Sequence, residues 1–216
     1  MVEMHLLSVN VDFRYDPIYA LGVVSSYDRF MQGYRPEQDK ASIFNAICKA
    51  LEDDPQRYQQ DAKLLEESAT RLSGQDLVAR LSQLDSSGSD DLRGQLQAIA
   101  NNDHFKYSRL FGIGLFTLLE LADADLVKDE KQRNAAIKSI CEALHLPEDK
   151  VQKDLELYRS NLEKMAQARI VMADMLEADR KKREKRAQDK GAVVASPNGP
   201  QEPTKAPGTP QDERSS

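Results

Sequence analysis

The most apolar stretch of the chain, "YSRLFGIGLFTLLELA" at residues 107–122, constrains the fold more than any other segment. A helix that crosses the ~30 Å hydrocarbon core of a membrane needs about 20 consecutive apolar residues. The uncharged run between Arg109 and Glu120 is only about half that length. The run therefore predicts a buried core helix rather than a membrane span.

Two glycines, Gly112 and Gly114, lie in the middle of this run. They lack the third glycine, the preceding strand and the acidic residue of a dinucleotide-binding turn, and they lack the spacing of a helix-dimerisation motif. Each glycine costs about 0.8–1 kcal/mol relative to alanine inside a helix. We therefore expect them to permit a close approach of neighbouring helices.

Helix start and stop signals occur along most of the chain. The Asp-Pro pairs at 16–17 and 54–55 each provide an N-cap followed by proline at the first helical position. The glycine in Ser73-Gly74 is expected to end the helix that starts at Asp54. No segment alternates with a period of two. The sequence predicts an all-α fold with helices over about 16–34, 35–54, 54–72, 75–84, 89–100, 104–122 and 130–144.

The last and longest helix is predicted over 147–186 and is expected to pack on a compact helical body at 1–146. Its apolar positions recur every three or four residues, with one gap at Arg169: Val151, Leu155, Tyr158, Leu162, Met165, Met172 and Leu176. About 38 residues give a helix of about 57 Å, whereas a body of this size is about 40 Å across. We expect its basic end to project. Because the gap weakens a coiled-coil seam, we also expect a monomer.

Composition narrows the possible functions. Residues 187–216 are rich in Pro, Gly and Ser and are expected to be disordered. A net charge of -6 argues against general nucleic-acid binding. Cys48 and Cys141 lie in helical patterns without metal-ligand spacing, which indicates reduced thiols in an intracellular compartment. The amino terminus shows no secretion signal.

The search for catalytic or metal-binding motifs yields no candidate. The three histidines are scattered, and no nucleophile elbow, Walker lysine or kinase motif is present. The acidic segment that begins at Asp123 resembles a calcium loop, but Lys128 and Asn134 stand where glycine and glutamate are needed. We therefore expect no catalytic residue, no cofactor and no metal.

A basic run near the end of the long helix supplies the candidate contact residues. These are Arg180, Lys181, Lys182, Arg183, Lys185 and Arg186, opposed only by Glu184. The run can be a solvated helix end that suits the macrodipole, a contact for a partner, or a contact for anionic lipid worth about 1 kcal/mol per charge. The lipid interpretation is weakened because no large apolar face follows Leu176.

Three separated segments of the chain are recognisable. "VEMHLLSVNVDFRYDPIYALGVV", "DRFMQGYRPEQDKASIFNAIC" and "FKYSRLFGIGLFTLLE" resemble the thylakoid-formation family, the photosystem II biogenesis proteins of cyanobacteria and chloroplasts. The resemblance covers about residues 2–180. It implies an all-helical, non-enzymatic protein that supports photosystem II assembly and repair. It also implies peripheral association with the cytoplasmic side of thylakoid membranes, or the stromal side in a plastid.

The partners implied by the resemblance are membrane-bound FtsH proteases and, beyond them, photosystem II assembly intermediates. No transit peptide is visible, so a cyanobacterial member is expected, although family members carry a further segment before "VEMHLL". The alternative functions are those of a peripheral lipid-binding or a pigment-handling thylakoid protein. The motifs at 13–15 and 34–36 are open to interpretation either as turn and packing residues or as contacts.

Overall fold

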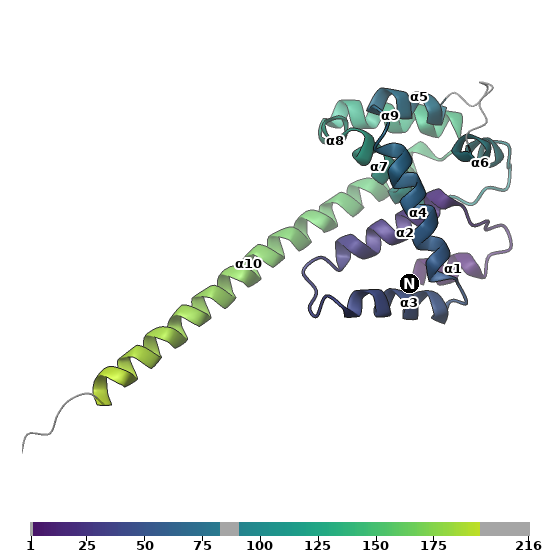
Figure 1. The fold of residues 1–216 in the computed structure, drawn as a ribbon. Helices are drawn as coiled ribbons and strands as arrows, with labels where there is room; N and C mark the ends of the chain where they lie inside the picture. The colour runs from purple at the N-terminus through teal and green to yellow at the C-terminus, as the bar shows by residue number, and fades with distance from the viewer. Residues whose placement is uncertain (1, 83–90, 195–216) are drawn as a thin grey trace, which may run out of the picture. The chain divides into compact units, whose positions relative to one another are not determined.

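A computed structural model describes residues 2–82 and 91–194. These residues form helices without any strand, which confirms the all-α prediction. The chain divides into two units, Met1–Arg169 and Ile170–Ser216. The helices are α1 (Val2–Ser8), α2 (Pro17–Phe30), α3 (Asp39–Ala50), α4 (Pro55–Ala69), α5 (Gly74–Ser82), α6 (Asp91–Ala100), α7 (Arg109–Ala122), α8 (Ala124–Lys128), α9 (Glu130–Ala143) and α10 (Glu148–Val194) (Figure 1).

Helix α7 is the central helix of the first unit, as its apolar sequence predicts. Every residue from Phe111 to Leu119 is buried, and α7 packs against α2, α4, α5 and α8. The helix starts at Arg109, so the expected start at about His104 was wrong. The Ser108 hydroxyl accepts a 3.1 Å hydrogen bond from the Phe111 N–H and caps the helix there. No helix in the part of the chain that the structure describes is long and apolar enough to span a membrane.

The packing of α2 on α7 depends on glycine, which confirms the expected close approach. A Cβ atom on Gly114 would lie 1.9 Å from the Ile18 carbonyl oxygen, and one on Gly22 would lie 1.7 Å from the Leu110 carbonyl oxygen. Gly112 instead faces the Tyr107 side chain. The two backbones are therefore too close for any side chain at Gly22 or Gly114, and α2 and α7 lie side by side in Figure 1.

The helix-start signals are confirmed at both Asp-Pro pairs, but the predicted stop signal at Gly74 is wrong. Asp16 and Asp54 accept hydrogen bonds from the N–H groups of Tyr19 and Gln56. Gly74 begins α5, because the Ser73 hydroxyl accepts from the Asp76 N–H and caps that helix. A Cβ on Gly74 would approach the Asp123 Cβ to 2.6 Å, so a contact between helices requires this glycine.

The acidic segment after α7 caps two helices instead of forming a calcium loop. The Asp123 carboxylate accepts from the N–H groups of Asp125 and Leu126 at the start of α8, a short helix that the sequence did not predict. The Asp129 carboxylate accepts from the Gln132 N–H at the start of α9. These carboxylates therefore satisfy helix N-termini.

Two apolar clusters make up the core. One joins α7 to α2, α4, α5, α6, α8, α9 and the start of α10, and the other joins α1, α2, α3 and α4. Cys141 lies in the first cluster and Cys48 in the second, and both thiols are free and buried, as predicted. Burial raises the pKa of Cys48 to about 11 and that of Cys141 to about 12.

Residues 148–169 of α10 belong to the first unit and pack in its core through the start of the predicted apolar seam. Val151, Leu155 and Tyr158 are buried. The gap at Arg169 is explained by a 3.0 Å hydrogen bond from its guanidinium to the Gln32 side chain. The helix continues to Val194, so its expected end at about Arg186 was wrong, and residues 187–194 are helical where disorder was expected. Residues 195–216 lie outside the described part, and the projection of the basic end stays a prediction.

Candidate functional site

The six predicted contact residues all lie in the second unit, on α10. Arg180, Lys181, Lys182, Arg183, Lys185 and Arg186 are exposed, as is every residue from Ile170 to Ala187. The structure therefore places the whole basic run on one fully solvated stretch of helix.

Two of these six cations are neutralised within the helix. Lys181 Nζ lies 2.8 Å from a Glu177 carboxylate oxygen, and Arg180 Nε lies 3.6 Å from one of Glu184. The expectation that only Glu184 opposes the run was wrong, because Glu177 precedes Lys181 by one helical turn. Lys182, Arg183, Lys185 and Arg186 have no carboxylate partner among the side chains that the structure describes.

An exposed apolar stripe precedes the cations, and sequence reasoning did not identify it as a surface. Val171, Met172, Met175 and Leu176 are 51%, 63%, 65% and 70% exposed. The apolar seam was expected to be packed, and only the burial of each position distinguishes the packed part from the exposed part. A cluster of exposed large apolar side chains is typical of an interaction site.

The apolar stripe and three of the unpaired cations share one face of α10. Steps of three or four residues keep side chains on one side of a helix. Such steps connect the following residues, which we call the 171–186 face: Val171, Met172, Met175, Leu176, Asp179, Lys182, Arg183 and Arg186. Asp174, Glu177, Lys181 and Glu184 are connected by the same steps on the opposite side. The 171–186 face is therefore apolar at its start and cationic at its end, with one carboxylate between.

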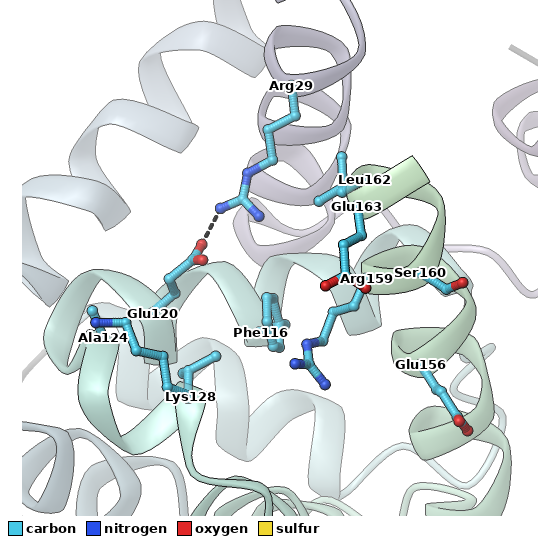
Figure 2. Close-up of a pocket in the computed structure, with 11 residues that line it drawn as sticks. Arg29, Phe116, Glu120, Ala124, Lys128, Glu156, Arg159, Ser160, Leu162 and Glu163 are labelled. Carbon is cyan, nitrogen blue, oxygen red and sulfur yellow. Dashed lines mark hydrogen bonds and ion pairs between the residues drawn. The ribbon is translucent and has the colours of Figure 1, made fainter. Parts of the chain in front are cut away.

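A groove of about 470 Å³ in the first unit is a second candidate site (Figure 2). An ion pair between Arg29 and Glu120 joins α2 to α7 at this groove, and Arg159 and Glu163 extend from α10. Its charged side chains are three cations and three carboxylates: Arg29, Lys128, Arg159, Glu120, Glu156 and Glu163. The groove is therefore formally neutral.

A third candidate is an apolar groove of about 400 Å³ between α1, α2, α3, α7 and α10. Its lining is mainly aliphatic and aromatic, and it includes Val23, Ile113 and Tyr158 from the core. The hydroxyl groups of Ser26 and Tyr158 are both buried and lie near each other in the lining of this groove. Burial raises the pKa of Tyr158.

The structure places the two motifs left open by the sequence at packing and turn positions. Tyr15 donates a 2.7 Å hydrogen bond to Asp61, the Arg57 guanidinium lies 3.7 Å above its ring, and Phe13 packs edge-on against Tyr19. Residues 34–36 lie in the turn between α2 and α3. Among the side chains that the structure describes, no group of three or more His, Cys, Asp or Glu could hold a metal ion.

These observations define an all-α protein in which exposed apolar side chains and cations share one face of a long helix. Comparison with known proteins identifies its family. The thylakoid formation protein family matches residues 1–187. The chain is 67% identical over 199 residues to protein Thf1 of a Nostoc species, covering 92% of this chain and 85% of that protein. It is 55% identical over 186 residues to protein Thf1 of Gloeothece citriformis, covering 85% and 82%.

A solved structure shows the same fold. The structure of Psb29 at 1.55 Å superimposes with a TM-score of 0.68 and 39% sequence identity, covering 85% of this chain and 84% of that chain. The chain belongs to the thylakoid formation protein family, which is implicated in thylakoid formation and photosystem II biogenesis. The resemblance stated from the three sequence segments is thereby confirmed.

Proposed function

We propose that this protein is a non-catalytic auxiliary factor in photosystem II biogenesis and repair and in thylakoid membrane organisation. It acts by binding and stabilising membrane FtsH proteases, on the cytoplasmic side of the thylakoid membrane. Its membership of the thylakoid formation protein family supports the process. The 171–186 face supports the mode of action, because it offers an exposed surface for a partner on an otherwise regular helix.

Binding alone is enough for such a role. A factor that binds an assembled complex but not its separated subunits stabilises the assembly by mass action. At a free concentration of 100 times its Kd, this stabilisation is about 2.7 kcal/mol. The number of FtsH complexes in the membrane then depends on the amount of this protein, without any chemical step.

The observation that carries the proposal is the combination on one face of Met172 and Leu176 with the unpaired Lys182 and Arg183. A contiguous group of exposed apolar side chains marks a surface that a partner can cover. The unpaired cations beside them favour a partner whose surface is anionic at the corresponding end. If the cations only stabilised the C-terminal end of the helix through its macrodipole, the exposed apolar residues beside them would have no role.

The test is deletion of the gene in a cyanobacterium and its replacement by the natural sequence. Deletion is expected to lower FtsH abundance and to slow the recovery of photosystem II activity after high light. Restoring the natural chain should restore both. Normal FtsH abundance together with normal recovery in the deletion strain would contradict the proposal.

A second candidate function is peripheral lipid binding, favoured by the four cations of the 180–186 basic run that have no carboxylate partner among the described side chains. Each could contribute about 1 kcal/mol beside an anionic membrane, within a Debye length of about 10 Å. Flotation of the purified protein with liposomes should then require anionic lipid and should be lost at high salt. Absent or salt-insensitive flotation contradicts this function.

A further inference from the structure

Apolar and charged side chains follow one another in a fixed order along the 171–186 face, and this order restricts what can bind there. Four apolar side chains come first, then Asp179, then Lys182, Arg183 and Arg186. Fifteen residue steps at 1.5 Å each make the face about 22 Å long, or about four helical turns. A complementary partner surface therefore carries apolar side chains first, then a basic side chain opposite Asp179, and then acidic side chains opposite the cations.

Two cations outside the 171–186 face are paired within α10, which makes them less available to a partner. Lys181 and Arg180 are paired with Glu177 and Glu184. Exposed pairs of this kind contribute little to stability, but they neutralise the charges involved. The net positive charge available to a partner is thus concentrated on the 171–186 face.

A second copy of this chain does not match the face. The face has one carboxylate, Asp179, and three cations. In a parallel pairing, Lys182, Arg183 and Arg186 would oppose themselves, and like charges in contact are repulsive. In an antiparallel pairing that apposes Met175 with Leu176, Lys182 would oppose Arg169. Because each copy offers only Asp179, two such faces cannot supply carboxylates for all three cations of either copy.

A lipid surface matches the cations but not Asp179. An anionic bilayer presents one sign of charge everywhere, so a carboxylate in the centre of the contact face would be repelled and desolvated. A protein surface can place a single basic side chain opposite Asp179 and carboxylates opposite the cations. The alternation of sign on the face therefore favours a protein.

We infer that the 171–186 face is the docking site for a helix of a protein partner. That helix has an apolar ridge, a basic residue next to it and a cluster of acidic residues beyond. It packs against Val171, Met172, Met175 and Leu176 in the manner of an amphipathic helix on an apolar stripe. The inference rests on the proposed function for the identity of the partner, a membrane protease complex. What it adds is the surface chemistry that the partner's helix must have.

The test is site-specific photo-cross-linking of the full chain in cyanobacterial thylakoids. A benzophenone amino acid replaces Met172 on the face or, as a control, Asp174 on the opposite side. Both positions are exposed. We expect a protein adduct at 172 and much less at 174, and the cross-linked peptide should lie in a helix that carries acidic residues.

Charge variants in the same assay separate the possible occupants. K182Q/R183Q should reduce the adduct at least about tenfold, which corresponds to a loss of about 1.4 kcal/mol of binding free energy for the two cations together. R180Q/K181Q removes the same two residue types from the paired side and should leave the adduct unchanged. D179K should weaken the adduct if the partner is the patterned protein helix, whereas it should strengthen binding to an anionic membrane.

The inference is overturned by an adduct to lipid or to a second copy, by stronger cross-linking with D179K, or by equal losses with the two double variants. The identity of the partner tests the proposed function separately. A patterned acidic helix that does not belong to an FtsH complex would support the docking site and contradict the protease partner.

Discussion

Replacing Gly22 by alanine tests the account of the core most sharply. The alanine Cβ would lie 1.7 Å from the Leu110 carbonyl oxygen, whereas ordinary contacts begin at 3.4 Å. The obstacle is backbone rather than a movable side chain, so α2 and α7 must separate by about 1.7 Å. The same reasoning applies to Gly114, whose Cβ would lie 1.9 Å from the Ile18 carbonyl oxygen.

The expected magnitude combines two opposing effects. Overpacking of a core costs about 1–3 kcal/mol, and a clash between backbones belongs at the upper end of that range. Removing a glycine from a helix interior gains about 0.8–1 kcal/mol. The free energy of unfolding should therefore fall by about 2 kcal/mol. For a chain of this size that lowers Tm by about 4–8 °C.

Gly94 provides the matched control, because a Cβ there would have no atom within 4 Å and the residue is exposed in α6. G94A should gain about 0.8–1 kcal/mol and raise Tm by about 2–4 °C. Thermal unfolding followed by far-UV circular dichroism measures both variants. A G22A protein as stable as the natural one would refute the backbone-contact account of the α2–α7 packing.

Three further predictions concern single groups. S108A removes the cap of α7 and should lower the urea-unfolding free energy by about 1 kcal/mol, whereas S108T should retain most of it; equal loss in both contradicts the capping role. Cys48 and Cys141 are buried with raised pKa values, so Ellman's reagent at pH 8 should react with neither thiol until the protein unfolds, and rapid reaction of the native protein would contradict their burial. Burial raises the Asp16 pKa from 3.8 to about 7, so its contribution to stability is present at about pH 4 and is lost as the pH rises to about 7. The unfolding free energy of D16N relative to the natural chain should therefore increase by on the order of 1–2 kcal/mol between pH 5 and pH 8, and a pH-independent difference would contradict the raised pKa.

Much of the fold was predictable because its signals are local. Asp16 and Asp54 cap helices in front of prolines, and the apolar run at 107–122 predicts a core helix by length and composition alone. The errors arose where a longer-range or competing contact decides. Gly74 reads as a helix end, but its contact with Asp123 and the cap from Ser73 make it a helix start.

The candidate site was only half predictable. Composition locates the basic run, because six cations in seven residues need no structure to be recognised. Met172 and Leu176 follow the same spacing as Val151 and Tyr158, so sequence alone assigns these two residues to the packed seam. Their exposure and the pairing of Lys181 with Glu177 depend on which side chains lie nearby in space, and the spacing of apolar residues in the sequence does not show this.

The central claim is that this protein binds a membrane FtsH complex, and affinity capture tests it most directly. Tagged natural chain, K182Q/R183Q and R180Q/K181Q are each recovered from mildly solubilised cyanobacterial thylakoids. The account predicts FtsH with the natural chain and with R180Q/K181Q, and a loss of FtsH with K182Q/R183Q. Recovery of only photosystem II assembly intermediates or lipids with the natural chain would contradict it.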